Sequence, residues 1–132
     1  MFIYELEMKV RDYECDIQGI VNNSVYQNYL EHTRHEFLED RKVSFADLHN
    51  RGIDAVVARL EMAFKTPLIP GDSFISKLYV HKEGVKYVFY QSIYRKSDMK
   101  LSIRAKVETV CVIDGKLSAG VPELDALCSQ TV

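Results

Sequence analysis

Apolar residues follow two different periods along this chain, and the change between them separates strands from one long helix. Every second position is apolar from residue 2 to residue 11, which predicts a strand with one buried face. From Asn22 to about Asp40, apolar and aromatic residues instead recur every three or four positions. This spacing predicts a helix with a single buried stripe, formed by Tyr26, Tyr29, Leu30, Thr33 and Phe37.

Four further strands are expected after the helix, because the alternating period returns. They cover residues 56–65, 74–82, 85–95 and 101–113. Glycine, proline and aspartate separate them and mark the turns. In the first of these strands the alternation places five residues on one face: Val56, Ala58, Leu60, Met62 and Phe64.

Two short segments complete the pattern. Residues 44–50 could form a turn before the second strand, and residues 122–127 could form a short helix near the end of the chain. The resulting order is strand, long helix and four-stranded meander. It predicts a single α+β domain over residues 1–132, in which a five-stranded antiparallel sheet wraps around one central helix.

One helix cannot cover both faces of such a sheet, so part of its surface needs another partner. Aromatic side chains contribute to this excess surface: Tyr79, Tyr87, Tyr90 and Tyr94. Uncovered apolar surface of this kind is typical of an interface between subunits. We therefore expect a homo-oligomer.

Composition excludes several function classes. The chain has 132 residues and a net charge of −2, so no basic field favours nucleic acid. No apolar run reaches the roughly 18–20 residues of a membrane span, and the N-terminus lacks the apolar core of a signal peptide. Three scattered cysteines predict reduced thiols and a cytoplasmic protein. No metal or cofactor motif occurs.

The candidate chemistry lies in residues 12–39, where a turn leads into the helix. Asp16 supplies a carboxylate, Gly19 permits an unusual backbone conformation, and Asn22, Asn23 or Ser24 can cap the helix. A helix N-terminus offers free N–H groups and a positive dipole end. From residue type and spacing alone, a turn or capping role is the more common one for such an aspartate, and the catalytic interpretation stays open beside it.

Residues 16–26, DIQGIVNNSVY, resemble the hotdog-fold acyl-CoA thioesterases, in particular the 4-hydroxybenzoyl-CoA thioesterase branch. The shared pattern has Asp16, Gly19, Val21 and Tyr26 in register. Residues 59–64 (RLEMAF), 70–72 (PGD) and 121–124 (VPEL) also resemble that family. The resemblance covers essentially the whole chain.

This resemblance implies a homodimer whose sheets join edge to edge, often paired again into a homotetramer, with active sites between subunits. It implies hydrolysis of an acyl-CoA thioester by Asp16, acting as nucleophile or as general base for water. The backbone N–H of Asn23 would polarise the thioester carbonyl. The expected substrate-binding residues are Gly19, Ile20, Val21, Asn22, Tyr26 and Glu61.

Other interpretations concern two side chains, Glu61 and Cys15, and two alternative functions. Glu61 could position water, or could simply belong to a solvated strand face. Cys15 adjoins Asp16, but a neighbouring carboxylate disfavours a thiolate nucleophile. The competing function is a non-catalytic module that binds acyl-CoA or an acyl carrier protein. A hotdog dehydratase is disfavoured because no His/Glu or Asp/His pair accompanies the turn.

Overall fold

The computed structural model describes residues 2–128. Its elements follow the predicted order, with two additions, a 3-10 turn and a sixth strand. They are β1 (Tyr4–Lys9), η1 (Asp12–Glu14), α1 (Asn23–Asp40), α2 (Phe45–Asn50), β2 (Ile53–Phe64), β3 (Ser73–Glu83), β4 (Lys86–Arg95), β5 (Leu101–Ile113), β6 (Lys116–Ser118) and α3 (Pro122–Asp125).

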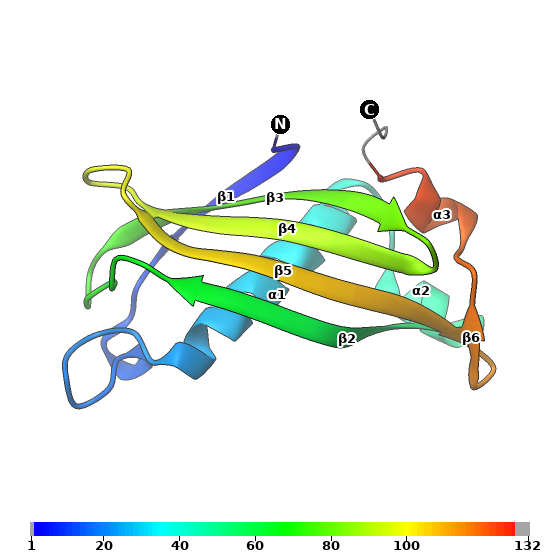
Figure 1. The fold of residues 1–132 in the computed structure, drawn as a ribbon, viewed down its shortest axis with the longest axis horizontal. Helices are drawn as coiled ribbons and strands as arrows, with labels where there is room; N and C mark the ends of the chain where they lie inside the picture. Colours follow the sequence, from blue (N-terminus) through cyan, green and yellow to red (C-terminus); the bar gives the residue numbers. More distant parts are fainter. Residues whose placement is uncertain (1, 129–132) are drawn as a thin grey trace.

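The strands form one antiparallel sheet in the order β1-β3-β4-β5-β2, with β6 paired to β5. Figure 1 shows α1 lying across one face of this curved sheet. The predicted α+β architecture, a sheet wrapped around one long helix, is therefore confirmed. Among residues 2–128, no helix is long and apolar enough to cross a membrane.

The expected count of five strands is too low by one. After β5 the chain turns at Asp114 and Gly115, both of which have positive φ angles of 50° and 81°. Such a two-residue turn is compatible with a tight hairpin, and it returns β6 alongside β5 for three residues. A strand this short is below the length at which alternation becomes recognisable in sequence.

The predicted helix stripe is buried against the sheet. All five of its residues are at most 4% exposed, and the Tyr29 ring lies 4.7 Å from the Phe74 ring of β3. Leu30 and Phe37 are completely buried. Burying side chains of this size contributes about 1.5–3 kcal/mol each to folding. The helix is therefore the central element of the core.

Strand β2 departs from its predicted alternation because of a β-bulge at Ala58. Val57 pairs with Thr109, and Leu60 pairs with Val107. Paired residues of antiparallel strands share a face, so Val57, not Ala58, lies on the same inner face as Leu60. A bulge places two residues of one strand opposite a single residue of its neighbour. The β2 residues before Ala58 therefore lie on the opposite faces from those that strict alternation predicts.

Tyr87 is also placed differently from its prediction, because it belongs to the core rather than to an uncovered surface. It is 3% exposed, and its hydroxyl accepts the Val121 N–H at 2.9 Å. The chain after β6 folds back and covers it. Tyr79 and Tyr90 are on the opposite face of the sheet, stacked with ring centroids 4.9 Å apart.

Candidate active site

The turn between β1 and α1 is closed by main-chain hydrogen bonds. The Asp16 N–H donates to Ile20 O at 2.9 Å, and the Gly19 N–H donates to Asp16 O at 2.9 Å. Cys15 and Val21 form a single antiparallel bridge. Gly19 has a φ of +77°, a conformation that favours glycine. The sequence thus folds into a compact loop whose two ends lie side by side.

The Asp16 carboxylate is partly buried in this loop. Its Oδ1 accepts the Gln18 N–H at 2.8 Å, the arrangement of an Asx turn. Within residues 2–128, Oδ2 accepts no hydrogen bond from the protein. Asp16 therefore has the turn role that was one of its two interpretations. Its Oδ2 is left free to accept a proton or to attack a substrate.

The start of α1 provides a free donor. Asn22 is the N-cap, and its side-chain oxygen accepts the Ser24 N–H at 3.0 Å and the Ser24 hydroxyl at 2.9 Å. This confirms a capping asparagine. Asn23 is the first helical residue, and no acceptor for its main-chain N–H occurs among the described residues. The 18-residue helix adds its positive dipole end at this N–H.

A cavity of about 200 Å³ lies beside Asn23. It collects four of the residues predicted to bind or polarise the substrate: Ile20, Val21, Asn23 and Tyr26. Phe64 of β2 lies against Tyr26, with ring centroids 5.7 Å apart. The Leu68 N–H donates to the Tyr26 hydroxyl at 3.3 Å, so this wall of the cavity is held in place from both sides.

The other predicted residues lie outside this cavity. Asp16 and Gly19 belong to the loop, and Asn22 to the helix cap, next to the cavity but not in its lining. Glu61 lies on the outer face of β2 opposite Lys106, and its carboxylate accepts Arg59 Nη2 at 3.2 Å. One protomer therefore does not bring Glu61 together with Asp16 and Asn23, and its role stays a prediction.

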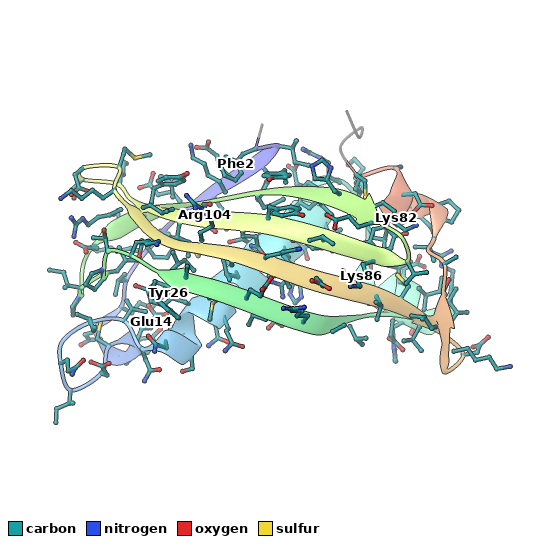
Figure 2. The ribbon with its side chains drawn as sticks, in the orientation of Figure 1. Phe2, Glu14, Tyr26, Lys82, Lys86 and Arg104 are labelled. Atoms are coloured by element: carbon teal, nitrogen blue, oxygen red, sulfur yellow. The ribbon has the colours of Figure 1, made fainter. Side chains whose placement is uncertain are left out.

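A supporting network escaped the sequence analysis. Glu14 accepts the Arg11 N–H at 2.8 Å and the Tyr29 hydroxyl at 2.7 Å. Burial alone would raise the pKa of Glu14, but these hydrogen bonds and the Arg11 guanidinium together lower it. Burial and then Glu14 raise the pKa of the Tyr29 hydroxyl. Figure 2 shows Glu14 close to the first turn of α1, where it ties the Asp16 loop to the helix.

Cys15 is unsuited to act as a nucleophile. Burial raises the pKa of its thiol, and the Asp16 carboxylate raises it further. The thiolate that would attack a thioester is therefore disfavoured. Among residues 2–128, no group of three or more His, Cys, Asp or Glu side chains is arranged to hold a metal ion.

Comparison with known proteins now identifies the family. The Thioesterase-like superfamily matches residues 10–126. The chain belongs to this superfamily. Over 87 residues it is 39% identical to the acyl-acyl carrier protein thioesterase ATL3, chloroplastic, of Arabidopsis thaliana. The matched segment covers 66% of this chain and 46% of that protein. The related ATL2 is 35% identical over 104 residues, covering 78% of this chain and 55% of that protein.

Solved structures of two thioesterases show the same fold. A 1,4-dihydroxy-2-naphthoyl-CoA thioesterase from Synechocystis superposes with a TM-score of 0.88 at 16% identity, covering 94% of this chain and 93% of that one. A 4-hydroxybenzoyl-CoA thioesterase bound to 4-hydroxybenzoyl-CoA gives 0.86 at 16% identity, covering 96% and 98%. The hotdog fold is confirmed. The chain spans about half the length of the two plant relatives.

Proposed function

We propose that this protein hydrolyses an acyl thioester carried by coenzyme A or by an acyl carrier protein. The observation that carries the proposal is the unpartnered Asn23 N–H at a cavity, one helix cap away from the Asp16 loop. Membership of the superfamily and the names of the relatives support the reaction class.

In the proposed mechanism the thioester carbonyl oxygen accepts the Asn23 N–H. Negative charge that develops on this oxygen is stabilised by the donor and by the dipole of α1. Asp16 then acts in one of two ways. It takes a proton from water, whose oxygen attacks the acyl carbon, or it attacks directly and forms a mixed anhydride that water hydrolyses. In both routes the C–S bond breaks. In the first route the leaving thiolate takes the proton that Asp16 removed from water; in the second it leaves as a thiolate that takes a proton from solvent, and hydrolysis of the anhydride restores the Asp16 carboxylate.

We further propose that the active unit is a homodimer joined along β2. This 12-residue strand forms one edge of the sheet, and several of its apolar side chains are exposed: Val56 at 45%, Val57 at 49% and Phe64 at 46%. An exposed edge with apolar side chains favours pairing with another strand. Pairing two β2 strands antiparallel would continue the sheet across both protomers.

A thiol-release assay tests the function. The protein is incubated with short-chain, long-chain and aromatic acyl-CoAs, and separately with the corresponding acyl carrier protein thioesters. We expect release of free thiol from at least one substrate in a protein-dependent manner. Saturable binding without release from any substrate would instead identify a non-catalytic acyl-carrier binding module.

A further inference from the structure

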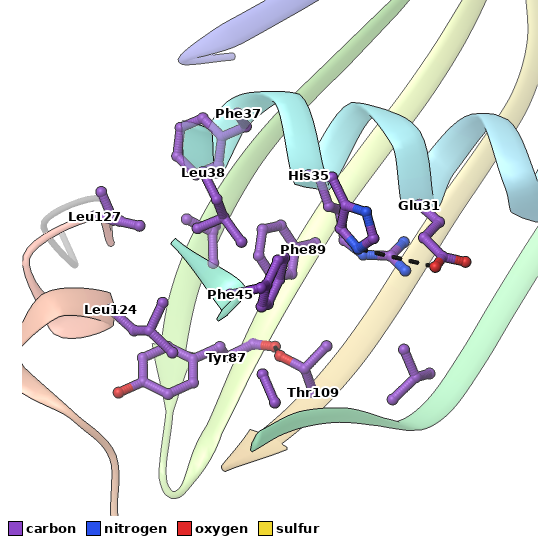
Figure 3. A pocket seen from close by; sticks show the side chains of 14 residues that line it. Glu31, His35, Phe37, Leu38, Phe45, Tyr87, Phe89, Thr109, Leu124 and Leu127 are labelled. Atoms are coloured by element: carbon purple, nitrogen blue, oxygen red, sulfur yellow. Dashed lines mark hydrogen bonds and ion pairs between the residues drawn. The ribbon is translucent and has the colours of Figure 1, made fainter. Parts of the chain in front are cut away.

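A second cavity lies at the other end of α1 from Asn23. It measures about 180 Å³ and is lined by the second half of α1, by strands β2, β3, β4 and β5, and by residues of α2 and of the α3 segment. Figure 3 shows Phe45 and Phe89 together in this space, with Leu124 and Leu127 on the α3 side. Its lining is mainly apolar. A smaller cavity of about 130 Å³ shares Glu31, Arg34 and Val57 with it and extends it toward Leu60.

Arg34 brings a positive charge to this apolar lining. Its side chain is partly buried, and its guanidinium lies 6.0 Å from the centroid of the Phe89 ring. Nη1 donates to Gln91 Oε1 at 3.0 Å. The Gln91 amide in turn donates to Leu30 O at 3.1 Å, which fixes its orientation toward Arg34. The partner of this cation is therefore a neutral amide.

No carboxylate forms an ion pair with Arg34 among the described residues. Glu31 also lines this cavity, but its exposed carboxylate lies 3.8 Å from the His35 Nε2 and is not paired with Arg34. Burial lowers the pKa of the Arg34 guanidinium, and Glu31 opposes this only in part. A guanidinium has five N–H donors and suits bidentate binding of a carboxylate. A half-buried cation with unused donors in an apolar cavity favours an anionic ligand.

The position of β2 connects this cavity to the proposed chemistry. Phe64, near one end of the strand, lines the Asn23 cavity, whereas Ala55 and Val57, near the other end, line the Arg34 cavity. Antiparallel pairing of two β2 strands places opposite ends of the strand side by side. In the proposed dimer, the Arg34 cavity of one protomer therefore lies toward the Asn23 cavity of its partner.

We infer that the Arg34 cavity binds the far end of the acyl group, and that Arg34 selects acyl groups bearing a carboxylate there. The apolar walls would cover the intervening methylene groups, and the guanidinium would bind the terminal oxygens. The inferred substrate class is thus the thioester of a dicarboxylic acid. This inference rests on the proposed thioesterase function and on its β2 dimer.

Matched acyl-CoA pairs test this inference. At each even chain length from six to twelve carbons, the CoA thioester of the monocarboxylic acid is compared with that of the dicarboxylic acid. We expect the wild type to favour the dicarboxylic substrate in kcat/KM for at least one length. Arg34→Met should lower kcat/KM for that substrate by about tenfold or more and for its monocarboxylic match by less than about threefold, because a charge-assisted contact is lost only in the first case.

Two variants serve as controls. Arg104→Met makes the same change at an exposed residue on the outer face of the sheet and should leave both substrates unaffected. Arg34→Lys keeps the charge and should retain part of the preference. An equal loss for both substrates in Arg34→Met, or a wild-type preference for the monocarboxylic substrate at every length, would overturn the inference.

The binding of the same thioesters separates this inference from the proposed function. If no thioester is hydrolysed, the two members of each pair are titrated by calorimetry against the wild type and Arg34→Met. Tighter binding of the dicarboxylic thioester that is lost in Arg34→Met would support the cavity assignment even though the hydrolase proposal had failed. Equal affinities in the wild type would overturn it.

Discussion

Asn23 offers a direct test of the oxyanion donor, because proline is well tolerated at the first position of a helix and has no N–H. The preceding residue, Asn22, has φ −64° and ψ 140°, a conformation compatible with a following proline. Asn23→Pro should therefore keep α1 but lower kcat by about 10²–10³-fold. Asn23→Ala keeps the N–H and should change kcat only slightly. Equal activity of the two variants would contradict the assignment.

Glu14 gives a pH-dependent prediction for the loop. Its pKa is lowered in the folded protein, so the folded state binds fewer protons at this site than the unfolded state. The resulting stabilisation is complete above the unfolded pKa and is lost as pH falls through the folded pKa. Urea unfolding should show that Glu14→Gln destabilises the protein at about pH 7 and much less at about pH 3. A difference that is the same at both pH values would contradict this role.

Much of the candidate site is local in sequence, and this explains why part of it could be predicted. Asp16, Gly19 and Asn22 interact within one loop and one helix cap, so spacing and residue type were informative. The contact of Glu14 with Tyr29 spans 15 residues, and that of Arg34 with Gln91 spans 57. Contacts at such separations depend on tertiary packing, which periodicity does not describe.

At the scale of elements, α1 derives its stability from its buried stripe. Leu30 is completely buried between the helix and the sheet. Leu30→Ala should lower the free energy of unfolding by about 2–5 kcal/mol, since it removes buried methyl groups and leaves a cavity. Asn28→Ala, at an exposed position of the same helix, should change it by less than about 0.5 kcal/mol. Similar effects of the two substitutions in chemical denaturation would contradict the predicted helix orientation.

Strand β2 shows where element prediction from sequence fails. Both Val56 and Val57 are apolar, so the alternation has no unique phase at that point. The bulge at Ala58 then decides which of them faces α1. The helix was predictable because its stripe continues over twelve residues, from Tyr26 to Phe37, without such an interruption.

For the whole molecule, the proposed dimer depends on the exposed edge of β2. Val56→Lys places a charge on this edge, a substitution that protects natural sheets from edge pairing. We expect the wild type to be at least dimeric and Val56→Lys to shift toward monomer in light scattering after size-exclusion chromatography. Leu117→Lys also replaces an exposed apolar side chain with lysine, on β6, where Leu117 is 63% exposed, and should leave the mass unchanged. A monomeric wild type would refute the dimer.

Hydrolysis by Asp16 is the central claim, and replacing its carboxylate with an amide tests it most directly. Asp16→Asn keeps the side-chain oxygen that accepts the Gln18 N–H, so the loop should stay folded, which circular dichroism can verify. The substitution removes the base or nucleophile. We predict that kcat on the best substrate of the thiol-release panel falls by about 10²–10⁴-fold. A folded Asp16→Asn protein that hydrolyses that substrate at close to the wild-type rate would contradict the account.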